Sequence, residues 1–132
     1  MPLRRLLGDR RGNAALEFAF ILPVFLMIFL GIFEFAGYMW VRNTVQFGAE
    51  EAARFAMANL DATTAQVASA ARARMTTLDA AKLTVDVQQV VDDGTTFIVV
   101  STTYTQPGGF LSGLFPTDLT TATGRARAPL VE

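Results

Sequence analysis

The sequence contains neither cysteine nor histidine, and lysine occurs only once, as Lys82. Without cysteine the chain has no disulfide framework and no thiolate metal site. Without histidine it also lacks the Ser-His and Cys-His catalytic pairs, the usual zinc ligands and the commonest general base near neutral pH. The carboxylates are scattered along the chain rather than paired. We therefore do not expect the protein to be an enzyme, and we predict that it binds no cofactor and no metal.

Charge is unevenly distributed, although the formal net charge is only −1. The first twelve residues contain four arginines and a single aspartate, which gives this head a net charge of +3. An excess of basic residues on one side of an apolar segment keeps that side in the cytoplasm. The rest of the chain is acidic on balance, and nothing in this pattern indicates a nucleic-acid partner.

A long apolar run follows the basic head, and within residues 14–41 only Glu17 and Glu34 carry a charge near neutral pH. As a helix this run would be roughly 40 Å long, which exceeds the roughly 30 Å hydrocarbon core of a bilayer. A cleavable secretory signal has a shorter apolar region than this one. Tyr38 and Trp40, at the end of the run, are typical of an interfacial aromatic belt. The sequence thus predicts a single-pass helix in the lipid bilayer, with the C-terminal part on the far side of the membrane.

The start of the run carries a short motif, GNAALEF, at residues 12–18. It resembles the processing site of type IV pilin-like proteins, with glycine before the cut, glutamate at the fifth mature position and phenylalanine at the sixth. With the short arginine-rich leader and the proline in the apolar run, residues 10–41 most resemble the TadE-like minor pilins, or pseudopilins, of tight-adherence (Flp) pilus systems. Related TadG-like proteins and type II secretion pseudopilins remain alternatives, although the length mildly disfavours a TadG-like protein.

The resemblance implies a set of roles and partners. A prepilin peptidase would cut between Gly12 and Asn13, and Glu17 with Phe18 would act in assembly, where the glutamate pairs with the free amino terminus, commonly that of a neighbouring subunit. The other partners would be further pilin subunits and the pilus assembly machinery. The protein would be stored in the bacterial inner membrane with its N-terminus cytoplasmic and its C-terminal domain periplasmic, and it would reach an extracellular pilus after assembly.

Several alternatives stay open. Glu17 is also compatible with a carboxylate that snorkels to the interface near the positive end of the helix dipole. Pro23 removes one helical hydrogen bond, which predicts a kink or a locally unwound turn. Glu34 is interpreted as solvated or snorkelling, with a subunit contact as the alternative. The chain as a whole could instead be an uncleaved signal-anchor protein with a partner-binding domain in the envelope.

Beyond Trp40 the helical pattern continues, and Asp61 is expected to cap a second helix within residues 61–78. Residues 83–91 and 95–104 then show strand chemistry, with a turn at residues 92–94, so they are predicted to form a β-hairpin. A third strand is expected in residues 118–131, where Gly124 and Pro129 limit its reach. Asp92 and Asp93 are interpreted as turn residues rather than calcium ligands, because the EF-hand spacing is absent.

The predicted fold class is α+β, a long N-terminal transmembrane helix that continues into a helical region and packs on a small antiparallel β-sheet, as in pilins. We expect three parts: a cytoplasmic leader at residues 1–12, a transmembrane and assembly helix at 13–41, and a periplasmic domain at 42–132. Two arginine pairs in the last part, Arg72 with Arg74 and Arg125 with Arg127, are expected to be solvated, with a basic patch toward anionic lipid or another subunit as the alternative. The apolar loop from Phe110 to Phe115 would either cover the sheet or form a docking surface.

Overall fold

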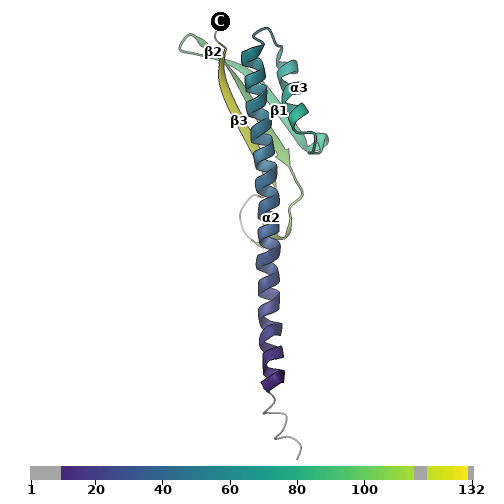
Figure 1. Cartoon of the computed structure of the whole chain (residues 1–132). Coiled ribbons are helices and arrows are strands. Elements are labelled where there is room, and N and C mark those ends of the chain that lie inside the picture. Colours follow the sequence, from purple (N-terminus) through teal and green to yellow (C-terminus); the bar gives the residue numbers. More distant parts are fainter. Residues whose placement is uncertain (1–9, 115–118, 131–132) are drawn as a thin grey trace, which may run out of the picture.

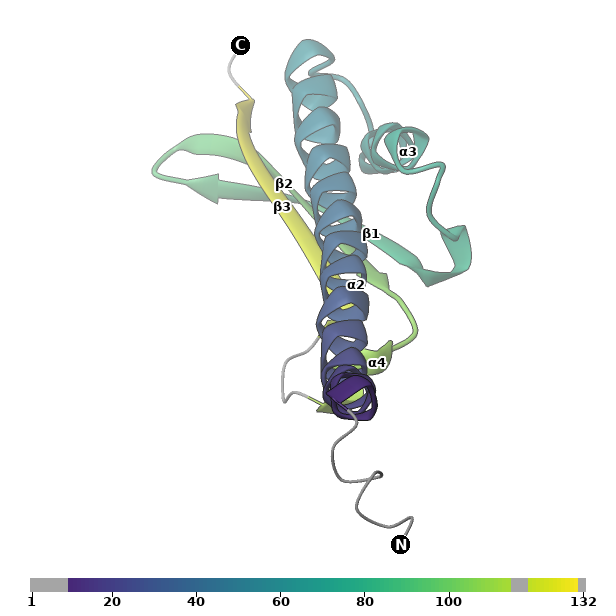
Figure 2. The ribbon, with the colours of Figure 1, turned by 60° about the horizontal axis from the view of Figure 1, so that its bottom comes forward.

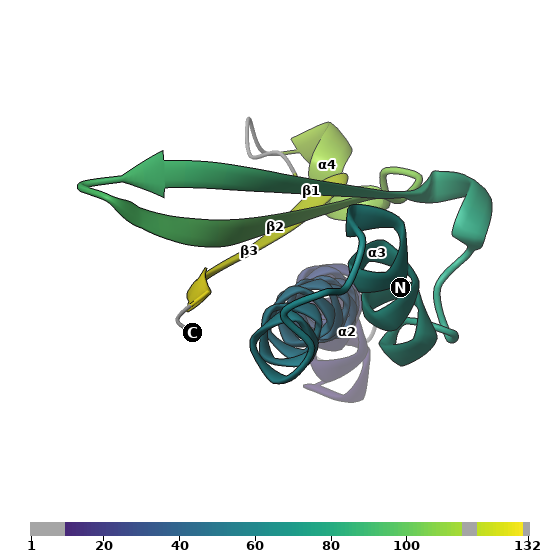
Figure 3. The same ribbon diagram turned by 90° about the horizontal axis from the view of Figure 1, so that it is seen from above.

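The computed structural model describes residues 10–114 and 119–130. One long helix, α2 (Arg10–Ala58), is followed by a shorter helix, α3 (Thr64–Arg74), and by a three-stranded antiparallel sheet. The first half of α2 extends alone from the rest of the molecule, and its second half lies along the sheet (Figure 1). Both helices cover the same face of the sheet (Figure 3). The predicted α+β class is confirmed.

Helix α2 continues well past Trp40, as the sequence pattern predicted, because its second half carries a stripe of small apolar residues. These residues recur every three or four positions, which places them on one face of the helix. All are buried and they form the centre of the core: Val41, Val45, Ala49, Ala52, Ala53 and Ala56. Because the stripe consists mainly of alanine, the helix axis approaches the sheet closely.

The close approach of α2 to the sheet is fixed by polar contacts as well. The fully buried hydroxyl of Thr102 donates to the carbonyl oxygen of Val45 at 2.8 Å. The side chain of Gln46 donates to the carbonyl of Arg125 at 3.1 Å and accepts from the amide of the same residue at 3.0 Å. A Cβ atom at Gly124 would lie 2.6 Å from the Val45 oxygen. The helix therefore rests directly on the sheet backbone at this glycine.

The N-cap of helix α3 lies two residues after the expected one, so the assignment of Asp61 was wrong. Thr63 is the N-cap, and it forms a capping box with Gln66 in which the threonine hydroxyl accepts from the Gln66 amide and the Thr63 amide donates to the glutamine side chain. A residue two positions earlier cannot form this reciprocal pair. The helix also ends at Arg74 rather than near residue 78.

The sheet has the order β1-β2-β3, and the predicted hairpin is confirmed. Strand β1 (Leu83–Asp92) follows a short 3-10 turn, η1 (Ala80–Lys82), and pairs with β2 (Thr95–Thr105). The two turn residues, Asp93 and Gly94, have φ values of 49° and 77°. Positive φ at both central residues is what a tight two-residue hairpin turn requires. Asp92, expected in the turn, is the last residue of β1.

The third strand, β3 (Thr121–Leu130), is also confirmed, but it is not shortened as expected. Gly124 and Pro129 both lie inside it. A proline is compatible with an edge strand, where one side of the backbone has no neighbouring strand to bond. The preceding segment is not a plain loop either, because it contains a short helix, α4 (Phe110–Leu114). Phe115, the last residue of the expected apolar loop, lies outside the described residues.

Candidate functional site

The first half of α2 is apolar and uncovered, which makes it the most unusual surface of the described molecule. The most apolar window of 18 residues has a mean hydropathy of 2.5, and only 6% of it is buried. Phe20 is 78% exposed and Phe18 is 62% exposed. In a water-soluble protein a helix of this composition would be covered by other elements. By length and composition α2 could cross a membrane once.

The predicted processing and assembly residues lie at the free end of this helix. The side-chain amide of Asn13 donates to a carboxylate oxygen of Glu17 at 3.2 Å, one helical turn away. Both side chains are otherwise exposed. The bond between Gly12 and Asn13 lies within the first turn of α2, which begins at Arg10. Residues 1–9, the rest of the predicted leader, lie outside the described residues.

Pro23 lies inside α2, and the backbone is helical on both sides of it. A locally unwound turn is therefore absent at this position. The bend expected at Pro23 remains a prediction.

Three phenylalanines line one face of the apolar segment and were not singled out from the sequence. Ring centroids are 6.1 Å apart for Phe25 and Phe29, and 4.9 Å apart for Phe29 and Phe33. The sequence does contain a signal for this stripe, because the three phenylalanines are four positions apart and residues at that spacing are neighbours on a helix surface. Sequence reasoning missed it because almost every residue in this run is large and apolar, so no face differs from the others in hydropathy alone.

Glu34 makes a contact that the sequence did not indicate. Its side chain is half-buried, and its carboxylate lies against Gly109, which immediately precedes α4. A Cβ at Gly109 would overlap with the Glu34 carboxylate. Helix α4 thus lies beside α2 at the level of Glu34 (Figure 2).

The arginine pairs that were expected to be solvated are partly engaged within the chain. Arg74 forms an ion pair with Glu51 at 2.8 Å, and Arg127 forms one with Asp92 at 2.6 Å while its guanidinium lies 3.8 Å from the centre of the Phe97 ring. Partly exposed pairs of this kind contribute less than about 1 kcal/mol each. They fix local surface geometry at Arg74 and Arg127.

Comparison with known proteins bears on the N-terminal segment. The family model described as TadE-like protein matches residues 12–54, which cover the predicted cut, the uncovered apolar helix and most of the helical stripe that packs on the sheet. No curated protein and no solved structure matches the chain. The match links the chain to tight-adherence pilus systems and to a structural rather than catalytic family. The resemblance seen in the sequence is thereby confirmed for residues 12–54, which match the TadE-like family model.

Proposed function

We propose that this protein is a minor pilin or pseudopilin of a tight-adherence pilus, which is stored in the inner membrane and released for assembly by cleavage after Gly12. The observation that carries the proposal is the division of α2 into an uncovered apolar half and a half that packs on its own sheet. A helix built this way has one half available to bilayer or neighbouring helices while the other half holds a folded domain. Residues 1–12, 13–41 and 42–132 would then be the leader, the membrane and assembly helix, and the periplasmic domain.

The dimensions of α2 support storage in a membrane. Glu17 and Glu34 are the two carboxylates that flank the charge-free part of the helix. They are seventeen residues apart, or about 26 Å along a helix, close to the thickness of the hydrocarbon core. Both carboxylates then lie near an interface, and the arginine-rich head stays in the cytoplasm.

The chemistry of the Asn13–Glu17 pair gives cleavage a role in assembly. Within the part of the chain that the structure describes, the Glu17 carboxylate accepts a hydrogen bond from the neutral side-chain amide of Asn13. Cleavage after Gly12 would create a charged amino group on Asn13, and two unit charges 4 Å apart attract by about 4 kcal/mol at an effective dielectric of 20, before desolvation. This is comparable to the roughly 2.5 to 3.5 kcal/mol that a charge costs within a membrane helix. Processing would therefore favour burial of Glu17 among packed helices.

An exposed aromatic stripe extends this packing surface past the charge-free part of the helix. Trp40 is 51% exposed and Phe47 is 50% exposed, and they lie two helical turns apart on the outer face of α2. A neighbouring helix that packs along the apolar half would meet these two side chains next. We include them in the proposed subunit contact.

The proposal is tested by replacing Glu17 with glutamine. We expect leader removal to remain normal, while the amount of processed subunit in sheared pili, or cross-linked to other pilins, falls at least about tenfold, since tenfold corresponds to only 1.4 kcal/mol. The measurement is quantitative immunoblotting of membrane and pilus fractions. The matched control is Glu50→Gln, which changes an exposed carboxylate of the same helix that accepts a hydrogen bond from Gln46 at 2.8 Å.

One observation favours the alternative of an uncleaved signal-anchor protein. The hydrogen bond from Asn13 already gives the Glu17 carboxylate a partner within the chain. Under this alternative the Glu17→Gln variant would behave as wild type, and the envelope domain would bind its partner with the leader still attached. Normal assembly of the variant would accordingly contradict the role of Glu17 proposed above.

A further inference from the structure

The segment Pro107–Leu114 lies at the end of the sheet nearest to the apolar half of α2. It contains α4, which contacts α2 (Figure 2). The contact between Gly109 and Glu34 places this segment beside position 34 of the long helix. By contrast, the turn between β1 and β2 lies at the opposite end of the domain (Figure 1).

The level of this segment coincides with the expected membrane boundary. Glu34 ends the charge-free run that begins after Glu17, and that run is about as long as the hydrocarbon core is thick. A segment that touches Glu34 from outside the helix therefore lies at the height of the lipid headgroups. This step depends on the membrane insertion of α2, which is part of the proposed function.

The composition of the segment suits that position. No ionisable residue occurs between Thr105 and Pro116, and the stretch is rich in glycine and large apolar residues. Phe110 is 46% exposed although it belongs to the folded domain. Aromatic side chains are favoured at membrane interfaces, where part of the ring contacts acyl chains.

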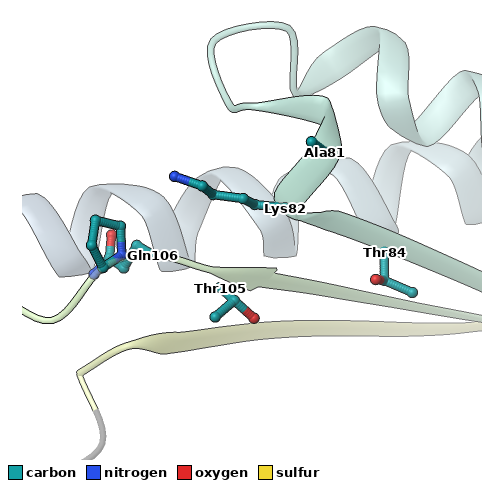
Figure 4. A pocket seen from close by; sticks show the side chains of 6 residues that line it. Ala81, Lys82, Thr84, Thr105 and Gln106 are labelled. Atoms are coloured by element: carbon teal, nitrogen blue, oxygen red, sulfur yellow. The ribbon is translucent and has the colours of Figure 1, made fainter.

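A basic residue, Lys82, lies at the same end of the sheet as the segment Pro107–Leu114. Lys82, the single lysine, lines a shallow groove of about 460 Å³ together with residues of both hairpin strands and Pro107. Its side chain points along the groove toward Gln106, the direction in which the chain continues to α4 (Figure 4). Its ammonium group is 3.8 Å from Asp79, and both side chains are about half exposed, so this pairing is weak.

We propose that Phe110 and Lys82 form a second membrane contact of this protein, in which Phe110 enters the interfacial layer and Lys82 faces the phosphates of anionic phospholipids. The apolar surface continues from the membrane helix onto α4, and the lysine is complementary to a negative lipid surface. Two contacts, one through α2 and one through α4, would fix the tilt and the rotation of the outer domain over the bilayer.

The experiment is fluorescence quenching in full-length protein reconstituted into vesicles. Trp40 is the only tryptophan, so Trp40→Phe gives a background without tryptophan emission. In this background Phe110→Trp is the test variant, and brominated lipids in zwitterionic or anionic vesicles are the quenchers. We expect most of the Phe110→Trp emission to be lost to shallowly brominated lipid, with greater loss in anionic vesicles.

Two matched variants separate this proposal from the proposed function. Phe29→Trp reports insertion of α2, and Val91→Trp, at a 71% exposed position beside the β1–β2 turn, reports the far end of the domain. Quenching of Phe29→Trp without quenching of Phe110→Trp would overturn the second contact while leaving membrane insertion intact. Absence of quenching in Phe29→Trp would overturn both.

Two further outcomes are decisive. If Phe110→Trp emission shifts to the blue with rising protein concentration but is not quenched by lipid, the surface contacts a second subunit and the proposal is wrong. Addition of Lys82→Gln to Phe110→Trp is expected to abolish the difference between anionic and zwitterionic vesicles. An unchanged difference would remove Lys82 from the lipid contact.

Discussion

Replacement of Gly12 by valine is expected to abolish removal of the leader. A Cβ with two branches at this position obstructs a peptidase that cuts directly after a glycine, and a β-branched residue also restricts the backbone beside the scissile bond. The measurement is the intact mass of protein co-expressed in membranes with its prepilin peptidase. Wild type is expected to lose residues 1–12 completely, and the variant is expected to retain them completely.

Gly37→Val is the matched control for this experiment. Gly37 belongs to the same helix, and an added Cβ would meet no atom within 4 Å. We expect the control to be processed like wild type, because it changes glycine to valine far from the cut. Leader loss in Gly12→Val, or an intact leader in wild type with active peptidase, would contradict the processing site.

Replacement of Gly124 by alanine is expected to destabilise the outer domain strongly. The new Cβ would lie 2.6 Å from the Val45 carbonyl oxygen and 2.7 Å from Cα of Gln46, both backbone atoms of α2 that cannot rotate away. Overpacking typically costs about 1–3 kcal/mol, and we expect the upper part of this range because α2 must shift as a unit. Pulse proteolysis in urea, with the full chain in detergent micelles, measures the free energy of unfolding.

Gly113→Ala provides the comparison for stability. An added Cβ at Gly113 would have nothing within 4 Å, and alanine is a better helix former than glycine. Its unfolding midpoint should equal or slightly exceed that of wild type. A Gly124→Ala midpoint as high as that of Gly113→Ala would mean that α2 does not rest on β3 as described.

Local patterns in the sequence predicted most of the fold. The hairpin followed from alternation on both sides of Asp93-Gly94, and the continuation of α2 followed from apolar residues at helical spacing. The cap of α3 was misassigned because Asp61 and Thr63 are both good capping residues. Only the glutamine three residues after Thr63 distinguishes them.

Contacts between distant residues were not predictable in this way. Glu34 and Gly109 are far apart in the chain, and neither carries a local signal for the other. The Gly124 contact is of the same kind, because a glycine within a strand pattern indicates a close approach but not its partner. For the candidate site, the motif at residues 12–18 supplied the residues, whereas the Asn13–Glu17 hydrogen bond required coordinates.

The continuity of α2 has a mechanical consequence. The helix has 49 residues, which corresponds to about 74 Å, and no loop separates its uncovered half from the half bound to the sheet. A force along the axis at the N-terminal end would therefore reach the sheet through a helix, with no loop to absorb it. Any machine that raises or turns the embedded half of this helix would lift or rotate the outer domain by the same amount.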